Sequence, residues 1–341
     1  MIRVGLVGYG FMGGMHSQCY AATGDAKVVA LADIEPERRE AAKAKLACET
    51  YDSIEAMLAS ADIDVVDICT PTYLHEGHVI AAAGAGKDIM CEKPMGLTLA
   101  ACDAMIDAVK SAGVKMMVGQ VIRFWPEYQV IKQIVDSGEH GKVQSVSAKR
   151  LSPPATWAWQ DWLADPTKSG GAIHDLHIHD QDYIAYLIGS PKKIQSRAIK
   201  GRKGGLDSVQ TLAWGHESGA SSYAEGSLMM APTFPFTMEL LVNCESASIG
   251  YCSGCDPSLT VYPFDGEPYC PELPEAKVGA SSETGGNISS LGGYFNEIRY
   301  FVDCIKAGKA PTIVTPETAR EAVRICLAAR KSVETGEAVE L

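Results

Sequence analysis

The stretch MIRVGLVGYGFMGGMHSQCY, residues 1–20, decides the fold of the first half of the chain. An apolar run is followed by GYGFMG, residues 8–13, and then by residues that favour a helix. This G-x-G-x-x-G predicts a tight turn between a strand and a helix. Gly8 permits the turn, Gly10 lets a pyrophosphate approach the backbone, and Gly13 lets the helix pack closely on the strand. Free N–H groups at the helix start suit phosphate oxygens, so the motif indicates a dinucleotide-binding unit.

An acidic residue at the end of the next strand indicates which dinucleotide binds. The run KVVALAD ends at Asp33, whose carboxylate would accept hydrogen bonds from the adenine-ribose hydroxyls. The same charge would repel a 2′-phosphate, which favours NAD. Arg38 and Arg39 could hold a 2′-phosphate, although we expect them on the exposed face of the following helix, and NADP stays possible. The alternative is an ordinary glycine turn followed by a solvated aspartate.

Short β-branched runs alternate with Ala-rich helical stretches up to residue 120. The expected strands are residues 2–8, 27–33, 65–71, 88–94 and 115–120, and the expected helices are residues 15–23, 36–47, 53–60, 75–86 and 98–113. Such alternation with short links predicts a parallel sheet with helices on both faces. We therefore predict an α/β fold with a doubly wound Rossmann domain at residues 1–120.

The second half, residues 121–341, shows a different pattern. Six strand candidates follow one another with few helices between them: residues 144–151, 193–200, 208–215, 220–230, 236–251 and 258–264. They predict an α/β domain with a large mixed or antiparallel open sheet. The Pro-, Gly- and Ser-rich stretch 263–293 is expected to be a long loop. Two helices are expected at residues 294–308 and 315–336, the second with Thr315 as N-cap and Pro316 at its first position.

Composition excludes several classes of protein. The 341 residues are 46% apolar and 21% charged, and no apolar run reaches the roughly 18 residues of a membrane span. The start shows no signal-peptide pattern, so a cytoplasmic protein is expected. The formal net charge of −12 argues against nucleic acid as a partner, because such binding needs a basic surface.

The 11 cysteines do not suggest a disulfide framework, because their number is odd and the chain is long. We expect reduced, mostly buried thiols. Cys244, Cys252, Cys255 and Cys270 could together hold zinc, but they contain a single C-x-x-C and lack the second pair. A turn between strands is the favoured interpretation, and metal binding at this cluster stays open.

Two further segments follow strands of the predicted parallel sheet. CTPTYLH, residues 69–75, comes after one strand, and Glu92-Lys93-Pro94 comes after the next. Ligands of open parallel sheets lie beyond the carboxyl ends of the strands, so both segments should face the dinucleotide. A partly desolvated lysine there could donate to a substrate hydroxyl or stabilise a developing alkoxide. Taken alone, a lysine in such a position is more often a surface lysine.

A histidine-rich run in the second half, SGGAIHDLHIHDQD at residues 169–182, carries the remaining signal. In a helix, Asp175 and His179 lie at i and i+4 on one face. A carboxylate that orients an imidazole makes a suitable general base for a hydroxyl proton. A metal is the rival interpretation, but His174 and His177 would lie on a different side. Ordinary core histidines are the third possibility.

The whole chain resembles a known family. GYGFMG, the acid at the second strand end, CTPTYLH, CEKPMG, QVIRFWPEY and SGGAIHDLHIHDQDYIAYLIG occur in the order and spacing of the glucose–fructose oxidoreductase, inositol dehydrogenase and MocA (Gfo/Idh/MocA) family. The resemblance implies a Rossmann domain, a C-terminal α/β domain whose open sheet builds dimers or tetramers, and NAD(P)-dependent oxidation or reduction of a sugar, cyclitol or related polyol. Ala172 replaces a frequent third glycine, and His174 and His177 are additional to the family pattern.

The resemblance also implies roles for particular residues. Lys93 matches the catalytic lysine, Asp175 and His179 match the catalytic Asp–His pair with His179 as proton acceptor, and Arg123 matches an arginine near the substrate. The dinucleotide would be lined by Gly8, Gly10, Phe11, Met12, Gly13, Asp33, Thr70, Pro71, His75, Glu92, Lys93 and Gln120.

The substrate is less constrained by the sequence. Trp157, Trp159 and Trp162 could form an apolar wall for a sugar ring, with Trp162 our candidate contact, but tryptophans buried in a core fit as well. Two other functions stay open: a glycosidase of the same fold that uses NAD as a redox relay, and a catalytically silent dinucleotide-sensing regulator.

Overall fold

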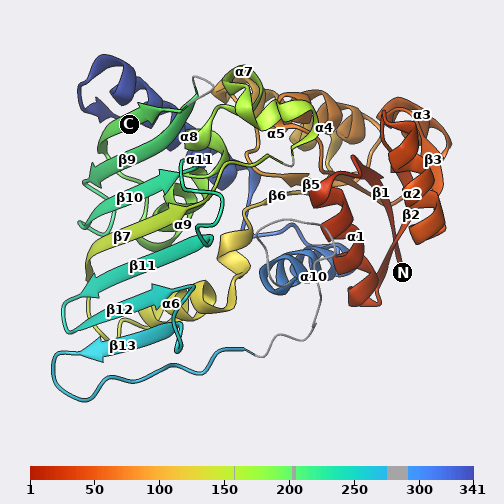
Figure 1. The fold of residues 1–341 in the computed structure, drawn as a ribbon. Helices are drawn as coiled ribbons and strands as arrows, with labels where there is room; N and C mark the ends of the chain where they lie inside the picture. Colours follow the sequence, from red (N-terminus) through yellow and green to blue (C-terminus); the bar gives the residue numbers. More distant parts are fainter. Residues whose placement is uncertain (157, 202–204, 275–290) are drawn as a thin grey trace. The chain divides into compact units, whose positions relative to one another are not determined.

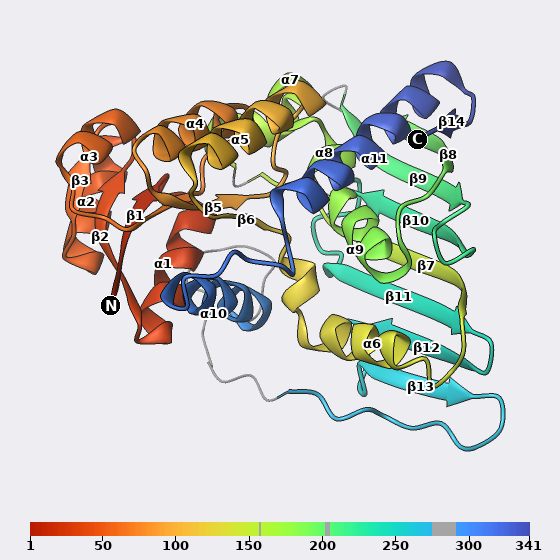
Figure 2. The same cartoon turned by 180° about the vertical axis from the view of Figure 1, so that it is seen from behind.

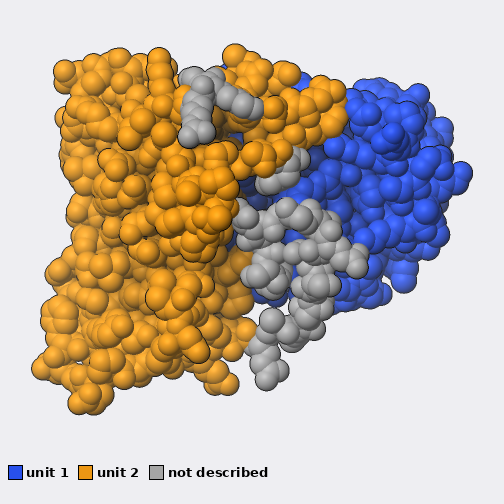
Figure 3. Space-filling model, in the orientation of Figure 1, with its two compact units in different colours: residues 1–124, 276–320 blue, residues 125–275, 321–341 orange. Residues whose placement is uncertain are grey.

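The computed structural model describes residues 1–156, 158–201, 205–274 and 291–341. The chain divides into two compact units, coloured separately in Figure 3. The first comprises residues 1–124 and 276–320, and the second residues 125–275 and 321–341. The first break lies close to the expected boundary at residue 120. The largest difference from the expected division is the segment that contains helix α10 (Gly292–Lys306): it was assigned to the second half by sequence order but belongs to the first unit, where α10 packs on α1 (Phe11–Thr23).

A parallel sheet forms the centre of the first unit. Its order in the described residues is β3-β2-β1-β4-β5-β6, the arrangement of a Rossmann fold, which confirms the predicted fold class. The strands are β1 (Ile2–Val7), β2 (Ala26–Ala32), β3 (Glu49–Tyr51), β4 (Val65–Ile68), β5 (Asp88–Glu92) and β6 (Met116–Gly119). The strands β4 and β6 are buried along their whole length, as expected for a sheet covered on both faces.

Helices cover both faces of this sheet. Figure 2 shows α4 (His75–Gly84) and α5 (Leu99–Ala112) on one side and α1 and α10 on the other. The remaining elements of the unit are α2 (Pro36–Leu46), α3 (Ile54–Ser60), η1 (Thr72–Leu74) and η2 (Val121–Phe124). Local signals set the helix ends: the Thr98 hydroxyl accepts from the Ala101 N–H at the start of α5, and Gly113 ends that helix in the left-handed region.

A mixed sheet forms the second unit. Its order is β13-β12-β11-β7-β10-β9-β8-β14 within the described residues, with β7 and β10 parallel and the other pairs antiparallel. The strands are β7 (Val143–Leu151), β8 (Lys193–Lys200), β9 (Leu206–Trp214), β10 (Ser221–Ser227), β11 (Thr237–Cys244), β12 (Ala247–Cys252), β13 (Leu259–Pro263) and β14 (Val339–Glu340).

One predicted strand, residues 236–251, is in fact two strands. β11 and β12 form an antiparallel hairpin that turns at Glu245 and Ser246. The N–H groups of these two residues donate to the carbonyls of Lys142 and His140, outside the ladder. The run is β-favouring throughout, so its composition concealed a turn that is stabilised by contacts distant in sequence.

Three helices cover one face of the mixed sheet. Figures 1 and 2 show α6 (Pro126–Ser137), α9 (Ile178–Ile188) and the second-unit part of α11 (Pro316–Thr335) on the same face. The buried rings of Tyr128, Tyr183 and Tyr251 make edge-to-face contacts between α6, α9 and β12. The N-cap of α11 is as predicted, because the Thr315 hydroxyl accepts from the Thr318 N–H.

A buried ion pair fastens α9 to the sheet. Arg150 of β7 donates to both carboxylate oxygens of Asp180, from Nε at 2.9 Å and from Nη2 at 2.8 Å. Both side chains are at most 2% exposed. Breaking such a pair leaves a buried charge unpaired and costs about 3–5 kcal/mol. Because Asp180 follows His179 directly, this pair also anchors the backbone beside the predicted base.

The cysteines depart from the expectation of free thiols at one point. Cys252 and Cys255 form a disulfide, since the β12–β13 turn brings their Cα atoms to 5.4 Å. Cys244 is buried and Cys270 is exposed. Among the described residues, metal-ligand side chains gather in a group of three or more only at His16, Asp67 and Cys69, so the four predicted cysteines do not converge. Residues 275–290 of the predicted loop lie outside the described residues.

In the part of the chain that the structure describes, no helix combines the length and apolar character needed to cross a bilayer.

Two further short helices and one 3₁₀ segment are described in the second unit: η3 (Trp159–Ala164), α7 (Pro166–Ser169) and α8 (Ala172–Asp175).

Candidate functional site

The glycine turn has the geometry that its sequence predicts. Gly8 has φ +90°, a conformation that favours glycine. A Cβ on Gly13 would lie 2.0 Å from the carbonyl oxygen of Gly8, so no other residue fits there while α1 packs against the turn. A Cβ on Gly10 would meet nothing closer than Arg38 Nη1 at 3.8 Å. The turn is therefore closed towards the sheet and open at Gly10, where a pyrophosphate would approach. Phe11 and Met12 form the half-buried first turn of α1.

Asp33 is held by the backbone on both of its carboxylate oxygens. Oδ2 accepts from the Tyr9 N–H at 2.7 Å, and Oδ1 accepts from the Glu35 N–H at 2.8 Å. The acid is thus fixed against the glycine turn, as the predicted ribose contact requires. Arg38 Nη1 lies 3.8 Å from Oδ2. Arg39 instead donates to the backbone carbonyls of Asp33 and Ile34, so of these two arginines Arg38 is the one that approaches the carboxylate.

The end of β6 supplies an independent indication of a ligand. Gln120 is 1% exposed, and neither its amide oxygen nor its amide nitrogen has a hydrogen-bond partner within the described residues. Leaving a buried polar group unpaired costs about 1–3 kcal/mol. Because Gln120 follows the carboxyl end of a sheet strand, where dinucleotides bind, a nicotinamide nucleotide fits the residues present here.

The loops after β4 and β5 are joined by a histidine. His75 is fully buried, with Nδ1 3.0 Å from the Pro94 carbonyl oxygen and Nε2 2.9 Å from the Thr70 carbonyl oxygen. Burial lowers the pKa of this imidazole, and the two carbonyls oppose the shift. His75 therefore links the Thr70-Pro71 turn to the Glu92-Lys93-Pro94 turn, and a contact with the dinucleotide stays a prediction for all of these residues.

Lys93 is half-buried at the carboxyl end of β5, as predicted. Its backbone N–H donates to Glu92 Oε2 at 3.0 Å. Arg123, the predicted substrate arginine, is 4% exposed and donates from Nη1 to the Ile313 carbonyl oxygen at 2.6 Å. That contact anchors the chain just before α11, so Arg123 has a structural role besides any role towards substrate.

The segment with Asp175 and His179 is not the continuous helix that was predicted. Helix α8 ends at Asp175 and α9 begins at Ile178. Between them the His177 N–H donates to the Ala172 carbonyl, five residues back, and the His179 N–H donates to the Leu176 carbonyl, three residues back. This wide turn changes the helical register, so the i, i+4 argument does not hold for the pair.

Burial nevertheless singles out the predicted pair. Within residues 172–180, Asp175 and His179 are half-buried, and the other residues are buried. They are the polar side chains of this run that retain access to solvent or to a ligand.

The additional histidines belong to the core. His174 Nδ1 lies 3.1 Å from Arg330 Nη2, and His177 Nε2 lies 2.9 Å from Thr211 Oγ1 and 2.8 Å from Gln181 Nε2. Burial lowers the pKa of each imidazole to about 3, reinforced by the charge of Arg330 for His174 and of Arg150 for His177. Asp180 is engaged by Arg150. These contacts direct the potential ligands into different parts of the core, which disfavours the metal interpretation of the run.

Two of the three tryptophans considered as substrate contacts lie in the described part of the chain. Trp159 and Trp162 are half-buried in η3, and no residue of that segment is fully buried. Neither ring is therefore fully buried, and the substrate contact of Trp162 stays a prediction. Trp157 lies outside the described residues.

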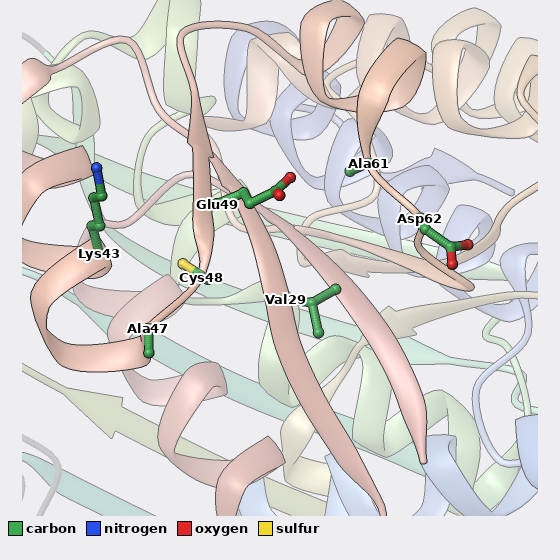
Figure 4. Close-up of a pocket in the computed structure, with 7 residues that line it drawn as sticks. All are labelled: Val29, Lys43, Ala47, Cys48, Glu49, Ala61 and Asp62. Atoms are coloured by element: carbon green, nitrogen blue, oxygen red, sulfur yellow. The ribbon is translucent and has the colours of Figure 1, made fainter.

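A surface pocket of about 560 Å³ lies elsewhere on the first unit. Figure 4 shows its seven lining residues, which are Val29, Lys43, Ala47, Cys48, Glu49, Ala61 and Asp62. Glu49 begins β3, and Asp62 precedes β4, so the pocket lies towards the amino ends of these strands. It is therefore distinct from the dinucleotide site at the carboxyl ends.

Sequence reasoning missed one group of residues near the site. His16 of α1 is fully buried, 2.8 Å from Asp67 of β4 and 2.9 Å from Glu92 of β5. The available signal was a charged residue within the otherwise apolar strand VVDI, which needed a buried partner.

Comparisons with known proteins agree with this architecture. Residues 2–120 match the model of an oxidoreductase family with an NAD-binding Rossmann fold, and residues 128–249 match the GFO/IDH/MocA C-terminal domain. An inositol 2-dehydrogenase of Rhizobium meliloti is 35% identical over 218 residues, which span 62% of this chain and 64% of that protein. A myo-inositol 2-dehydrogenase of Thermotoga maritima is 26% identical over 100% of this chain and 98% of its own.

A solved structure matches along the full length. A putative myo-inositol dehydrogenase from Sinorhizobium meliloti superposes with a TM-score of 0.82 and 27% identity, covering 100% of this chain and 99% of that one. The first match covers the six strands of the parallel sheet, and the second covers β7 to β11 and the start of β12 in the mixed sheet. The chain belongs to the GFO/IDH/MocA family of NAD-binding oxidoreductases.

Proposed function

We propose that this protein is an NAD-dependent dehydrogenase that oxidises a CH–OH group of a cyclitol, sugar or related polyol. The observation that carries the proposal is the selective exposure of Asp175 and His179 in a run whose other residues are buried. A half-buried histidine is suited to accept a hydroxyl proton near neutral pH. Membership of the family, and relatives named as inositol dehydrogenases, support this class of substrate.

NAD would be held by the first unit. The turn at Gly8, Gly10 and Gly13 would bind the pyrophosphate, Asp33 the adenine ribose, and Gln120 would offer its unpartnered amide. The other predicted contacts are Phe11, Met12, Thr70, Pro71, His75, Glu92 and Lys93. When bound, the nicotinamide ring supplies a hydride acceptor.

In the proposed reaction, His179 accepts the proton of the substrate hydroxyl. Lys93 donates to the same oxygen and stabilises the negative charge that develops on it. Asp175 binds a neighbouring hydroxyl or orients the imidazole, and Arg123 and Trp162 contribute to substrate binding. Each role follows from the match to the family pattern and from the half-buried state of Lys93, Asp175 and His179.

We further propose that the open face of the mixed sheet binds a second copy of this chain. The face carries Leu212, Tyr223, Leu241 and Tyr262, which are 37–48% exposed. Tyr223 pairs with both Leu212 and Ser147, and Ser147 pairs with Leu241, so three of these side chains follow one row across β9, β10, β7 and β11. Lys149 and Glu239 pair on the same face. An apolar row beside balanced charges suits a self-complementary dimer interface, which also occurs within a tetramer.

The dehydrogenase proposal is tested by offering a panel of inositols, aldoses and other polyols with NAD and following NADH absorbance. Steady NADH formation that depends on one polyol class supports it. The rival glycosidase would release sugar from a glycoside without net NADH, and a regulator would bind NAD without turning over any polyol. Either of these two results would replace the proposal.

A further inference from the structure

A buried histidine lies between two carboxylates beneath the glycine turn. His16 Nδ1 lies 2.8 Å from Asp67 Oδ2, and its Nε2 lies 2.9 Å from Glu92 Oε1. The side chains of His16 and Asp67 are fully buried, and that of Glu92 is 7% exposed. Three elements that are separate in sequence, α1, β4 and the end of β5, therefore meet at one imidazole.

The charges at this cluster favour a proton on both ring nitrogens. Burial alone would lower the pKa of His16, but the attraction of Asp67 and the contact with Cys69 raise it well above its usual range. An imidazolium carries an N–H on each ring nitrogen, so Nδ1 can donate to Asp67, while Nε2 faces Glu92 Oε1 in an ion-pair contact that lacks the alignment of a hydrogen bond. Other titratable groups around the cluster include Cys19 and Tyr20 of α1, His75 of α4, Cys91 of β5 and Glu297 of α10. Burial raises the pKa values of the Cys19 thiol and the Tyr20 phenol, which keeps both protonated.

A metal does not explain the same geometry. Cys69 Sγ lies 3.4 Å from His16 Nδ1, so three potential ligands are close together. However, two ligands on one tetrahedral zinc are about 3.3 Å apart, given bonds of about 2.0–2.1 Å. The separation of 2.8 Å between His16 Nδ1 and Asp67 Oδ2 is that of a charge-assisted hydrogen bond.

The cluster continues to the backbone of Lys93. Glu92 uses Oε1 towards His16 and Oε2 to accept from the Lys93 N–H at 3.0 Å. Gly119 of β6 lies opposite Glu92 in the sheet, and a Cβ on it would come within 3.2 Å of Oε1. The carboxylate thus contacts His16 through Oε1 and the Lys93 N–H through Oε2, in space that the missing Cβ of Gly119 leaves open, and it fixes the first peptide of the turn that carries the proposed catalytic lysine.

We propose that His16 is a positioning residue for Lys93: bridging Asp67 and Glu92, it holds the Glu92 carboxylate where that group fixes the Lys93 backbone. This inference rests on the proposed role of Lys93 for its effect on turnover. Its structural part, the control of Lys93 placement, does not depend on which substrate is oxidised.

Two substitutions at His16 separate the arms of the bridge. An asparagine amide reaches the position of Nδ1 and keeps the contact with Asp67, whereas a glutamine amide reaches the position of Nε2 and keeps the contact with Glu92. His216→Gln is the matched control, because His216 is a buried histidine of the second unit that bonds Gly189 and Ser222. Thermal melts establish the folded fraction of each variant.

Two readouts are compared. The first is the rate at which Lys93 is reductively methylated, measured by mass spectrometry with and without NAD, which needs no substrate. The second is kcat with the best polyol. We expect His16→Asn to change the labelling rate about threefold or more and to lower kcat about 10- to 100-fold, as small displacements of catalytic groups do. His16→Gln should stay within about threefold of the wild type in both, like His216→Gln.

The inference is overturned if folded His16→Asn labels Lys93 like the wild type, or if the asparagine and glutamine variants lose kcat equally. If His16→Asn does not fold, Glu92→Gln replaces it: altered Lys93 labelling supports the inference and unaltered labelling refutes it. A wild type that oxidises no polyol refutes the proposed function, and the labelling comparison then decides the positioning role separately.

Discussion

Replacing Asp33 by asparagine should shift cofactor preference from NAD towards NADP. The carboxylate is held by the N–H groups of Tyr9 and Glu35, at 2.7 and 2.8 Å, so its place beside the glycine turn is fixed. Asparagine keeps the shape and one acceptor and removes the charge. Alanine would also remove both acceptors, so it would confuse cofactor choice with damage to the turn.

The size of the effect follows from the charge. A carboxylate that lies about 5 Å from one negative charge of a 2′-phosphate repels it by about 3 kcal/mol at an effective dielectric constant of about 20. Arg38, 3.8 Å from the carboxylate, offsets part of this repulsion. We therefore expect the ratio of kcat/KM for NAD to that for NADP to fall about 10- to 100-fold, equivalent to about 1.4–2.7 kcal/mol.

The assay is initial-rate kinetics with each cofactor at saturating polyol. Glu37→Gln is the matched control, because it removes an acidic charge from the exposed start of α2. It should leave the ratio within about twofold. A wild type that prefers NADP, or an Asp33→Asn variant with an unchanged ratio, would refute the assignment of Asp33 to the ribose.

Three further predictions follow from the contacts. Lys93→Met keeps most of the side-chain stem but removes the hydrogen-bond donor, so kcat should fall about 100-fold or more. NAD affinity, measured by calorimetry, should persist. Near-normal turnover in a folded variant would exclude the proposed catalytic role of Lys93. Burial lowers the pKa of His177 to about 3, so its neutral form contributes to the free energy of unfolding above about pH 6.5, and this contribution is lost as the pH falls. Between pH 7 and 5, the free energy of unfolding from urea titrations should therefore fall about 2 kcal/mol less for His177→Gln than for the wild type. Parallel pH profiles of the two proteins would contradict this prediction. Leu241→Glu on the open sheet face should dissociate the oligomer in light scattering, whereas Ile80→Glu on α4 should not; a monomeric wild type would end the interface proposal.

The Rossmann unit could be predicted from sequence because its signals are local. A strand, a glycine turn, a helix and Asp33 follow one another within the first part of the chain, and each has a distinct composition. The three-residue strand β3 was missed because it is short and contains no fully buried residue. Helix α6 was missed as well, and α10 was assigned by sequence order although it packs on α1, a contact that no local pattern reveals.

The candidate site was predictable as a set of residue types but not as geometry. Asp175 and His179 were chosen for helical spacing, yet the backbone between them makes a wide turn, and differential burial is what distinguishes them. His75 and Arg123 were expected to face ligands, and the structure adds buried contacts to backbone carbonyls for both. His16 was missed because its partners Asp67 and Glu92 are distant in sequence and meet only in the folded sheet.

The most direct test of the central claim is the pH dependence of polyol oxidation in the wild type, His179→Gln and His174→Gln. If His179 accepts the hydroxyl proton, wild-type kcat/KM should rise with pH through one ionisation near neutrality, because the imidazole must be neutral to act. His179→Gln should lose about 10²- to 10⁴-fold in rate together with that ionisation, while folded His174→Gln should keep both. A His179→Gln variant that retains the wild-type profile would contradict the account.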